Sequence, residues 1–444
     1  MKTICNWMSP IGWGWLLFIG LTACEPIGSA SPPGIWTSAP DNMNIPMEDS
    51  LLYDRILASL IGSAIGDAMG APTEMWSRSE IQAQYGFVAG LEDMVRAPSP
   101  EGTWAHNLPA GGTTDDTRWK HLMADFLSRN QEISAQTFAK HIVSSYQTSI
   151  SDLQGRDGKE IGLLESDMHR IQWLREWALV GKPFLEEDHS GYQIALSKFY
   201  GGEMVCAGML FSPVLGMINP GNPVQAYLHT REINLFDIGY AQDISGLTAS
   251  LVAAAMVEKP SQDSVWKIFR EVDPHGYFDS RLVGRSAYKW FENARRIAYK
   301  ARQAKSEEIL ADPPVTLMLP LKTLADSIQY AQWAVAYSEL DKLNMTYPFH
   351  PAEIYLINLT ALMLCEFDFM KTLQFIVNYG RDNDTVAAVA GAILGAFHGT
   401  AGIPRDWQEQ VLRTQIEMGI DLKAMAHQLL LKAQKGSGAS PDIQ

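Results

Sequence analysis

Two short acidic motifs, far apart in the chain, carry the residue types from which metal sites are built. They are Thr114-Asp115-Asp116-Thr117 and Asp382-Asn383-Asp384-Thr385. Carboxylate and hydroxyl oxygens without a nearby His or Cys are ligands that suit Mg²⁺ or Mn²⁺ better than zinc or copper. Two such clusters brought together could hold two ions side by side and position a nucleophilic water molecule.

Helix capping is the alternative interpretation, because Asp and Thr are good N-caps and each motif stands at the start of a segment with helical periodicity. A cap needs one such residue, whereas the motifs supply four carboxylates, from Asp115, Asp116, Asp382 and Asp384. Four carboxylates at one place repel one another unless a cation binds. The pattern therefore predicts that the two motifs meet in one metal site.

The elements that must position these motifs are helices. Apolar residues recur at three- and four-residue spacing, and alternating strand-like stretches are nearly absent. The expected helices are Leu51–Met69, Trp119–Leu127, Ile161–Leu179, Ile244–Val257, Leu282–Ala304, Leu321–Leu340, Ile354–Tyr379 and Val386–Phe397, with loops at Ser212–Val224 and Asp273–Ser280. We predict one large all-α domain over residues 51–435 and a disordered tail over residues 436–444.

Two of these helices carry a glycine at every fourth position. The glycines are Gly62, Gly66 and Gly70 in the first helix and Gly391, Gly395 and Gly399 in the last. Each interior helical glycine costs about 1 kcal/mol relative to alanine, so a stripe of them needs compensation. Close backbone approach between the two helices provides it. A membrane span is the rival interpretation, which Asp67 and His398 make unattractive.

Composition limits the functional classes. The 444 residues are 46% hydrophobic, enough for a sizeable core, and the formal net charge of −15 argues against a nucleic-acid partner. Cys206 and Cys365 lack the spacing of a zinc ribbon or redox motif. They are either a disulfide pair or two buried free thiols.

The N-terminus has the order of an export signal. Lys2 precedes an apolar stretch that is too short to span a bilayer, and Leu21-Thr22-Ala23-Cys24 resembles the lipoprotein box. We therefore expect a lipoprotein signal peptide over residues 1–23, lipidation of Cys24, and a flexible tether over residues 24–50. The protein would then be an exported bacterial lipoprotein anchored to a membrane. A non-cleaved apolar tail is the alternative.

Three sequence blocks together resemble the signature of the ADP-ribosylglycohydrolase family. They are Ile61–Glu74 (IGSAIGDAMGAPTE), Gly112–Thr117 (GTTDDT) and Gly380–Thr385 (GRDNDT). The resemblance implies an all-α fold around a dinuclear Mg²⁺ or Mn²⁺ centre. It implies the metal ligands Thr114, Asp115, Asp116, Asp382, Asp384 and Thr385, with Glu74 as the catalytic residue. The implied substrate is an ADP-ribosylated protein or a small ADP-ribose compound.

The chain departs from the family pattern where the substrate should bind. Arg381 stands where many members have a second glycine, next to the second ligand block. In the middle of the chain, the segment that includes Gly201 and Gly202 replaces an Asn-Gly-rich loop ending in Met-Arg, and Tyr240–Gly246 replaces a segment that often carries His. We expect Gly201, Gly202 and Arg381 to contact substrate, in an altered pocket.

The resemblance thus predicts a metal-dependent hydrolase that removes ADP-ribose from an acceptor. One alternative is a non-catalytic protein of the same fold that binds ADP-ribose or a nucleotide. Another is a hydrolase of a different N-glycosidic or phosphate bond, since the pocket is altered.

Overall fold

Helices are the only regular elements of the computed structural model, which describes residues 47–96, 107–154 and 161–436. The predicted all-α class is therefore confirmed for this part of the chain. The expected signal peptide, Cys24 and most of the expected tether lie outside the described residues, as does the expected tail after Gly436. The first helix begins at Asp49.

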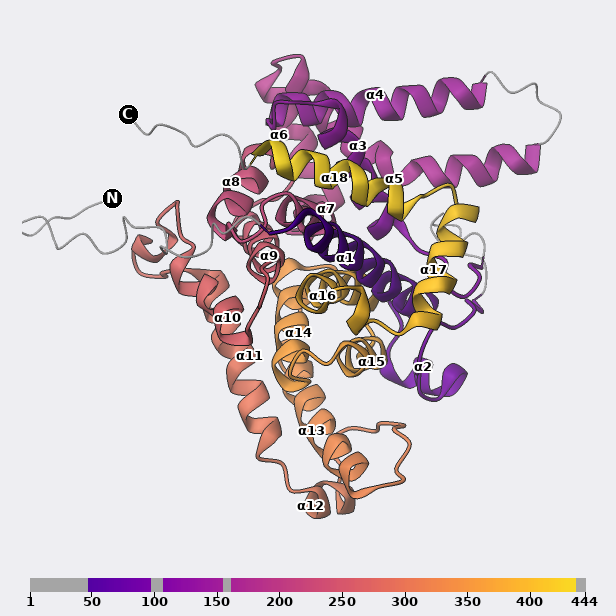
Figure 1. Ribbon diagram of the computed structural model, residues 1–444, viewed down its shortest axis with the longest axis vertical. Helices are drawn as coiled ribbons and strands as arrows, with labels where there is room; N and C mark the ends of the chain where they lie inside the picture. Colours follow the sequence, from indigo (N-terminus) through magenta and orange to yellow (C-terminus); the bar gives the residue numbers. More distant parts are fainter. Residues whose placement is uncertain (1–46, 97–106, 155–160, 437–444) are drawn as a thin grey trace, which may run out of the picture. The chain divides into compact units, whose positions relative to one another are not determined.

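Figure 1 shows how the elements are arranged; the longest connections run from α2 to α3 and from α12 to α13. The α-helices are α1 (Asp49–Gly70), α2 (Arg78–Tyr85), α3 (Asp115–Arg129), α4 (Ala135–Gln154), α5 (Ile161–Leu185), α6 (His189–Lys198), α7 (Ala207–Met217), α8 (Pro223–Ile233), α9 (Ala241–Ala255), α10 (Gln262–Glu271), α11 (Ser286–Arg302), α12 (Ser306–Ala311), α13 (Leu324–Asp341), α14 (Pro351–Leu364), α15 (Phe369–Tyr379), α16 (Asn383–His398), α17 (Arg405–Glu417) and α18 (Leu422–Gly436). Short 3₁₀ helices are η1 (Ala71–Thr73), η2 (Phe199–Gly202), η3 (Tyr277–Asp279) and η4 (Thr400–Gly402).

Helices α1 and α16 form a tightly packed pair at the centre of the fold (Figure 1). A Cβ atom added to Gly62 would lie 2.3 Å from the carbonyl oxygen of Gly391, and one added to Gly391 would lie 2.0 Å from that of Gly62. The corresponding distances to the opposite backbone are 2.0–2.3 Å for Gly66, Gly70 and Gly395. The predicted close approach is confirmed for these five glycines. Gly399 instead follows the end of α16 with a φ of 72°, and a Cβ atom on it would meet the Asp54 carboxylate.

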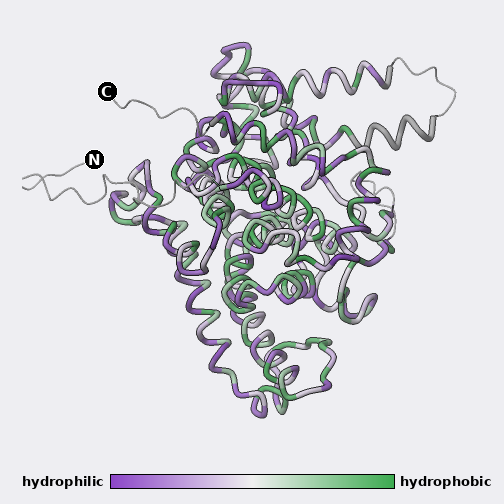
Figure 2. Tube along the Cα trace, viewed as in Figure 1, coloured by the Kyte–Doolittle hydropathy of each residue, from purple (hydrophilic) through white to green (hydrophobic). Residues whose placement is uncertain are grey.

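Helix α1 has the length and hydropathy of a membrane-spanning helix, but the fold itself buries it. The candidate span covers Asp49–Thr73, and 94% of its most apolar window is buried within the protein. Figure 2 shows hydrophobic residues along the central helices and many hydrophilic residues along α11. Among the described residues, the apolar character of α1 is thus accounted for by its place in the core.

Two expectations about local structure are wrong. The expected helix Ile354–Tyr379 is two helices, because the chain turns at Glu366 and Phe367 with positive φ angles of 54° and 63°, and Asp368 then caps α15. The expected loop Ser212–Val224 is largely helical, since α7 continues through Pro213 to Met217. Apolar periodicity alone misses a turn between two buried helices. Proline and glycine favour a loop near Ser212, but the helix continues through Pro213.

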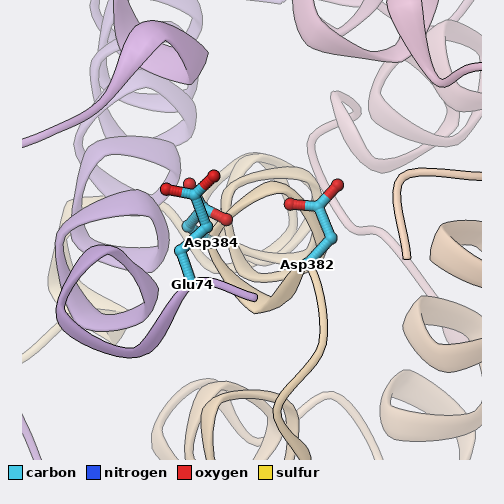
Figure 3. Close-up of side chains that lie close together, drawn as sticks. All are labelled: Glu74, Asp382 and Asp384. Carbon is cyan, nitrogen blue, oxygen red and sulfur yellow. The ribbon is translucent and has the colours of Figure 1, made fainter. Parts of the chain in front are cut away.

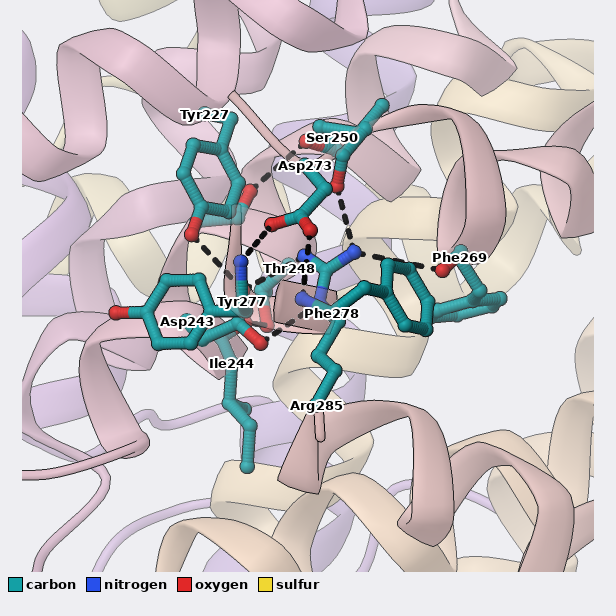
Figure 4. A network of polar contacts seen from close by, with 12 residues as sticks. Tyr227, Asp243, Ile244, Thr248, Ser250, Phe269, Asp273, Tyr277, Phe278 and Arg285 are labelled. Atoms are coloured by element: carbon teal, nitrogen blue, oxygen red, sulfur yellow. Dashed lines mark hydrogen bonds and ion pairs between the residues drawn. The ribbon is translucent and has the colours of Figure 1, made fainter. Parts of the chain in front are cut away.

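A buried ion pair holds the segment between α10 and α11 in place (Figure 4). Arg285 donates to both carboxylate oxygens of Asp243, over 2.7 and 2.9 Å, and both side chains are fully buried. Tyr227 donates to the same carboxylate over 2.8 Å, and Arg285 also donates to the carbonyl of Val272. Arg285 and Asp243 compensate each other's buried charge, and Tyr227 adds a hydrogen bond to the carboxylate. The ion pair therefore holds the segment between α10 and α11 against α8 and α9. Elsewhere in the core, Cys206 and Cys365 are buried free thiols.

Candidate metal centre

Both acidic motifs lie at helix N-termini, as the sequence suggests. Thr114 is the N-cap of α3, and its hydroxyl accepts a hydrogen bond from the backbone N–H of Asp116. Asp382 is the N-cap of α16, and Asp384 lies in the first turn of that helix. Helix N-termini carry partial positive charge and free N–H groups, so both positions favour carboxylates.

The fold brings the two motifs into direct contact. The Thr114 hydroxyl donates to Asp384 Oδ2 over 3.2 Å, and the Thr385 hydroxyl donates to Asp116 Oδ2 over 2.9 Å. These four residues are all buried, as is Asp382, while Asp115 is half-buried. Residues about 270 positions apart in the sequence therefore form one cluster.

Glu74 joins the cluster from the first sequence block. It directly follows the 3₁₀ turn at the end of α1, is half-buried, and contributes a carboxylate within 4.8 Å of the carboxylate oxygens of Asp382 and Asp384. Figure 3 shows its carboxylate beside that of Asp384. The Arg96 guanidinium donates to the carbonyl of Glu74 over 2.7 Å and so holds this segment at its backbone.

The carboxylates of the cluster have too little positive charge around them to offset their own negative charge. Burial, followed by the charge of neighbouring carboxylates, raises the pKa of Asp382 to about 7 and that of Asp115 to about 6. Burial and the adjacent Glu74 carboxylate also raise the pKa of Asp384. Ionisation of these groups therefore costs more within the protein alone than it does in water.

The donor set fits a hard divalent cation. Asp116 Oδ1 and Asp384 Oδ1 are buried and accept no hydrogen bond from the described residues. The ammonium group of Lys120 lies 3.5 Å from Asp116 Oδ1, too far for a hydrogen bond. Buried carboxylate oxygens that accept no hydrogen bond are costly, and an ion bound to oxygen ligands would compensate both of them. The acidic cluster could therefore bind a metal ion.

Asp67 supports the first motif from α1. Its carboxylate accepts hydrogen bonds from the backbone N–H groups of Thr114 and Thr117, each over 2.9 Å, and from the Thr117 hydroxyl over 2.6 Å. It therefore orients the start of α3. From the sequence alone, Asp67 argues only against a membrane span. Its place in the Gly66-Asp67 block beside the glycine stripe was the available signal.

Lys120 is a second residue that the sequence analysis missed. It lies one helical turn after Asp116 on α3 and is 1% exposed. Its ammonium group donates to the Asp116 carbonyl over 3.0 Å and lies 3.5 Å from Asp116 Oδ1. The spacing of four residues between an acid and a base in a helix was the available signal.

Arg381 is engaged within the protein. Its guanidinium forms a two-pronged ion pair with Glu353, over 2.7 and 2.9 Å, and also donates to the carbonyl of Met345. Glu353 is 1% exposed, so the pair compensates a buried carboxylate. The Arg381 backbone has a positive φ of 70°, a conformation that a glycine would adopt at lower cost.

Gly201 and Gly202 form a tight exposed turn at η2, with φ angles of 71° and 83°. A Cβ atom on Gly202 would lie 2.7 Å from the Ser197 carbonyl oxygen, so the turn requires glycine there. Tyr200 shares the turn with a φ of 46°. Burial of its hydroxyl and the nearby Asp115 carboxylate raise the pKa of Tyr200, although 45% of the residue is exposed. The Tyr200 hydroxyl therefore lies within electrostatic range of Asp115 in the first motif.

Comparison with known proteins finds relatives over most of the chain. Residues 48–439 match the family described as ADP-ribosylglycohydrolase. The chain is 26% identical over 356 residues to the uncharacterized protein YegU of Escherichia coli (strain K12), covering 79% of this chain and 89% of YegU. It is 22% identical over 366 residues to the ADP-ribosylarginine hydrolase Tri1 of Pseudomonas putida (strain GB-1), covering 82% of this chain and 75% of Tri1. A solved structure described as an ADP-ribosylglycohydrolase-related protein complex aligns at a TM-score of 0.47 and 16% identity, over 86% of this chain and 99% of that one.

Proposed function

Because this chain belongs to the ADP-ribosylglycohydrolase family, we propose that it is a metal-dependent hydrolase that cleaves the glycosidic bond between ADP-ribose and an acceptor. The observation that carries the proposal is the pair of reciprocal hydrogen bonds between the motifs, Thr114 to Asp384 and Thr385 to Asp116. A scaffold without metal chemistry has no physical need for carboxylates clustered in this way.

The oxygens of both motifs hold Mg²⁺, or Mn²⁺ in its place, and the number of ligands suits two ions. The proposed ligands are Thr114, Asp115, Asp116, Asp382, Asp384 and Thr385. When bound, such ions supply Lewis acidity and fix the ribose hydroxyls. Asp116 Oδ1 and Asp384 Oδ1, the two buried oxygens that accept no hydrogen bond, support binding at both motifs.

Glu74 is the proposed catalytic carboxylate. Departure of the acceptor leaves oxocarbenium-like charge on the ribose carbon, which an adjacent carboxylate stabilises, and the same carboxylate accepts a proton from an attacking water. Its half-buried position beside Asp382 and Asp384 supports this role, because substrate and water reach it from outside.

The first acceptor to test is arginine, since the similar protein Tri1 is described as an ADP-ribosylarginine hydrolase. Gly201 and Gly202 are the proposed substrate contacts on the turn beside Asp115, and Tyr200 from the same turn borders the site. The ion pair of Arg381 with Glu353 favours a supporting role for Arg381 over direct contact with a phosphate.

Release of ADP-ribose from peptides carrying ADP-ribosylarginine or ADP-ribosylserine tests the proposal, measured with the purified full chain in Mg²⁺ and in EDTA. We expect release that requires the metal. Glu74→Gln should lower kcat by about 10²-fold or more while Mn²⁺ still binds, because general acid–base groups contribute typically 10²–10⁴-fold. Glu417→Gln, an exposed carboxylate on α17, is the matched control and should leave kcat unchanged.

The outcomes separate the proposal from its alternatives. Metal binding and ADP-ribose binding without turnover would identify a non-catalytic member of the fold. Turnover only of other N-glycosides or of phosphate esters would show that the enzyme cleaves a different bond. A Glu74→Gln enzyme with wild-type kcat would remove Glu74 from the chemistry.

A further inference from the structure

Lys120 lies in the core, where burial of a charged lysine side chain is energetically unfavourable. Its side chain is among the largest fully buried ones in the described residues, at 1% exposure. Lysine is rarely buried so completely unless it is paired, because removing an ammonium group from water costs several kcal/mol. Its nearest acidic partner is Asp116, whose Oδ1 lies 3.5 Å from the Lys120 ammonium.

The partners of Lys120 are the acids of the candidate metal centre. The ammonium group interacts electrostatically with Asp67 and Asp115 as well as with Asp116. Asp116 Oδ1, which faces Lys120, is also one of the two carboxylate oxygens that accept no hydrogen bond. The lysine therefore supplies positive charge at the place where a metal ion would supply it, and its burial keeps it from a substrate entering from solvent.

We propose that Lys120 is a built-in counter-cation of the metal centre. It keeps Asp116 in place when no ion is bound, and it weakens the binding of the ion that Asp116 ligates. This inference rests on the proposed metal-dependent function and concerns how firmly that same site holds its ion.

Coulomb's law gives the direction of both effects. An ammonium group near a carboxylate cluster lowers the repulsion that opposes folding without metal. The same ammonium group repels a divalent cation at Asp116, and this repulsion is strong because the site is shielded from water. The protein thus remains folded without its ion and exchanges the ion readily.

Neutral and charge-retaining substitutions of Lys120 in the full chain test the proposal. Mn²⁺ affinity is measured by calorimetric titration, and the melting temperature is measured in EDTA and in saturating Mn²⁺. For Lys120→Met we expect the Kd for Mn²⁺ to fall by about tenfold or more, because a like charge close to the ion is removed. The melting temperature should fall in EDTA and recover in saturating Mn²⁺. Lys120→Arg keeps the charge and should keep the wild-type pattern.

Lys432→Met is the matched control. Lys432 lies on α18 and donates to the backbone carbonyls of Asn130 and Gln131, so its loss removes the same charge and the same kind of hydrogen bond away from the carboxylates. Its melting temperature should fall equally in EDTA and in Mn²⁺, with an unchanged Kd.

Several results would overturn the counter-cation role. They are an unchanged or higher Kd in Lys120→Met, equal effects of the Met and Arg substitutions, or a Met variant that stays unfolded in saturating Mn²⁺, because a metal ion would then fail to replace the lost charge. A wild-type protein that binds no Mn²⁺ would overturn the proposed metal dependence together with this inference. Wild-type binding with an unaffected Lys120→Met variant would overturn this inference alone.

Discussion

At the scale of single residues, the buried carboxylates make stability without metal depend on pH. The pKa of Asp382 is raised to about 7 and that of Asp115 to about 6, above their usual values in an unfolded chain. A raised pKa in the folded state gives stability that is present below about pH 4 and is lost as the pH rises through 6 and 7. A bound cation cancels this loss, since it favours the ionised form.

We therefore predict that the gain in melting temperature from saturating Mg²⁺, relative to EDTA, widens between pH 5 and pH 8. Half-buried histidines such as His229, whose pKa is lowered to about 4, contribute stability that increases as the pH rises. This contribution is the same with Mg²⁺ and with EDTA, so it cancels in the difference between the two melting temperatures. Scanning calorimetry at four pH values provides the measurement. A gain that stays constant across the range would mean that these carboxylates do not bind the ion.

Arg381 offers a prediction that distinguishes stability from substrate binding. Arg381→Gln leaves Glu353 buried without its counter-charge, which should lower the free energy of unfolding by about 3 kcal/mol. KM should remain near the wild-type value, as the guanidinium is occupied by Glu353. Urea denaturation and steady-state kinetics measure the two effects.

The double variant Arg381→Gln/Glu353→Gln is the control, and it should recover part of the lost stability because no unpaired charge remains. A raised KM at unchanged stability would instead place Arg381 on the substrate.

Residue identity predicted that the two acidic motifs form one site, because clustered carboxylates are the ligands of hard cations. Glu74 was added only by the resemblance to the ADP-ribosylglycohydrolase family. The structural roles of Asp67 and Lys120 could not be predicted from residue type and spacing. Asp67 is a capping residue only because α1 crosses the start of α3. Lys120 is buried only because the surrounding helices cover that face of α3, and a single sequence does not state which face is covered.

At the scale of elements, the glycine stripe continues to the candidate metal centre. A Cβ atom on Gly70 would lie 2.3 Å from Asp384 Cα and 2.4 Å from its backbone nitrogen. Gly70→Ala should therefore displace the start of α16 and lower Mn²⁺ affinity, because functional sites tolerate only about 0.5 Å of misplacement. Overpacking of this kind typically costs about 1–3 kcal/mol, so the domain should still fold.

Gly181→Ala is the matched control for this change. Gly181 is also a buried helical glycine, but its nearest neighbour to an added Cβ is a Val143 methyl group at 3.4 Å. Its stability should change by no more than about 1 kcal/mol and its Mn²⁺ affinity should not change. If Gly70→Ala melts earlier yet binds Mn²⁺ like the wild type, the stripe serves stability alone.

Apolar residues at three- and four-residue spacing predicted the principal helices. The glycine stripes predicted the α1–α16 pair, because glycine is small enough for two helix backbones to approach closely. The breaks were harder to predict. The turn at Glu366 and Phe367 uses left-handed backbone at residues that rarely adopt it, and no glycine marks it. Conversely, the proline and glycine residues near Ser212 indicated a loop, whereas burial of the whole of α7 overrides those preferences.

At the scale of the whole molecule, we propose that the chain is exported and anchored through Cys24, a residue outside the described part of the chain. Cys24→Ser should abolish lipidation and release the protein from membranes, because the lipid supplies the membrane affinity. The melting temperature of the helical domain should not change. Membrane fractionation and mass spectrometry of the N-terminus provide the measurement, and a mutant that sediments with membranes as the parent does would point to another anchor.

The pairing of α1 with α16 also sets the order of events on the ribosome. Ser59 on α1 donates to the carbonyl of Ala392, 333 positions later in the chain. At typical synthesis rates of about 5–20 residues per second, roughly 17–67 s pass between the synthesis of Ser59 and that of Ala392. During that interval the apolar residues of α1 lack the helix against which they pack in the folded protein. Among the described residues, the first helix to be translated thus has to wait for one of the last to be made, and we expect a holding chaperone to bind the nascent chain at α1.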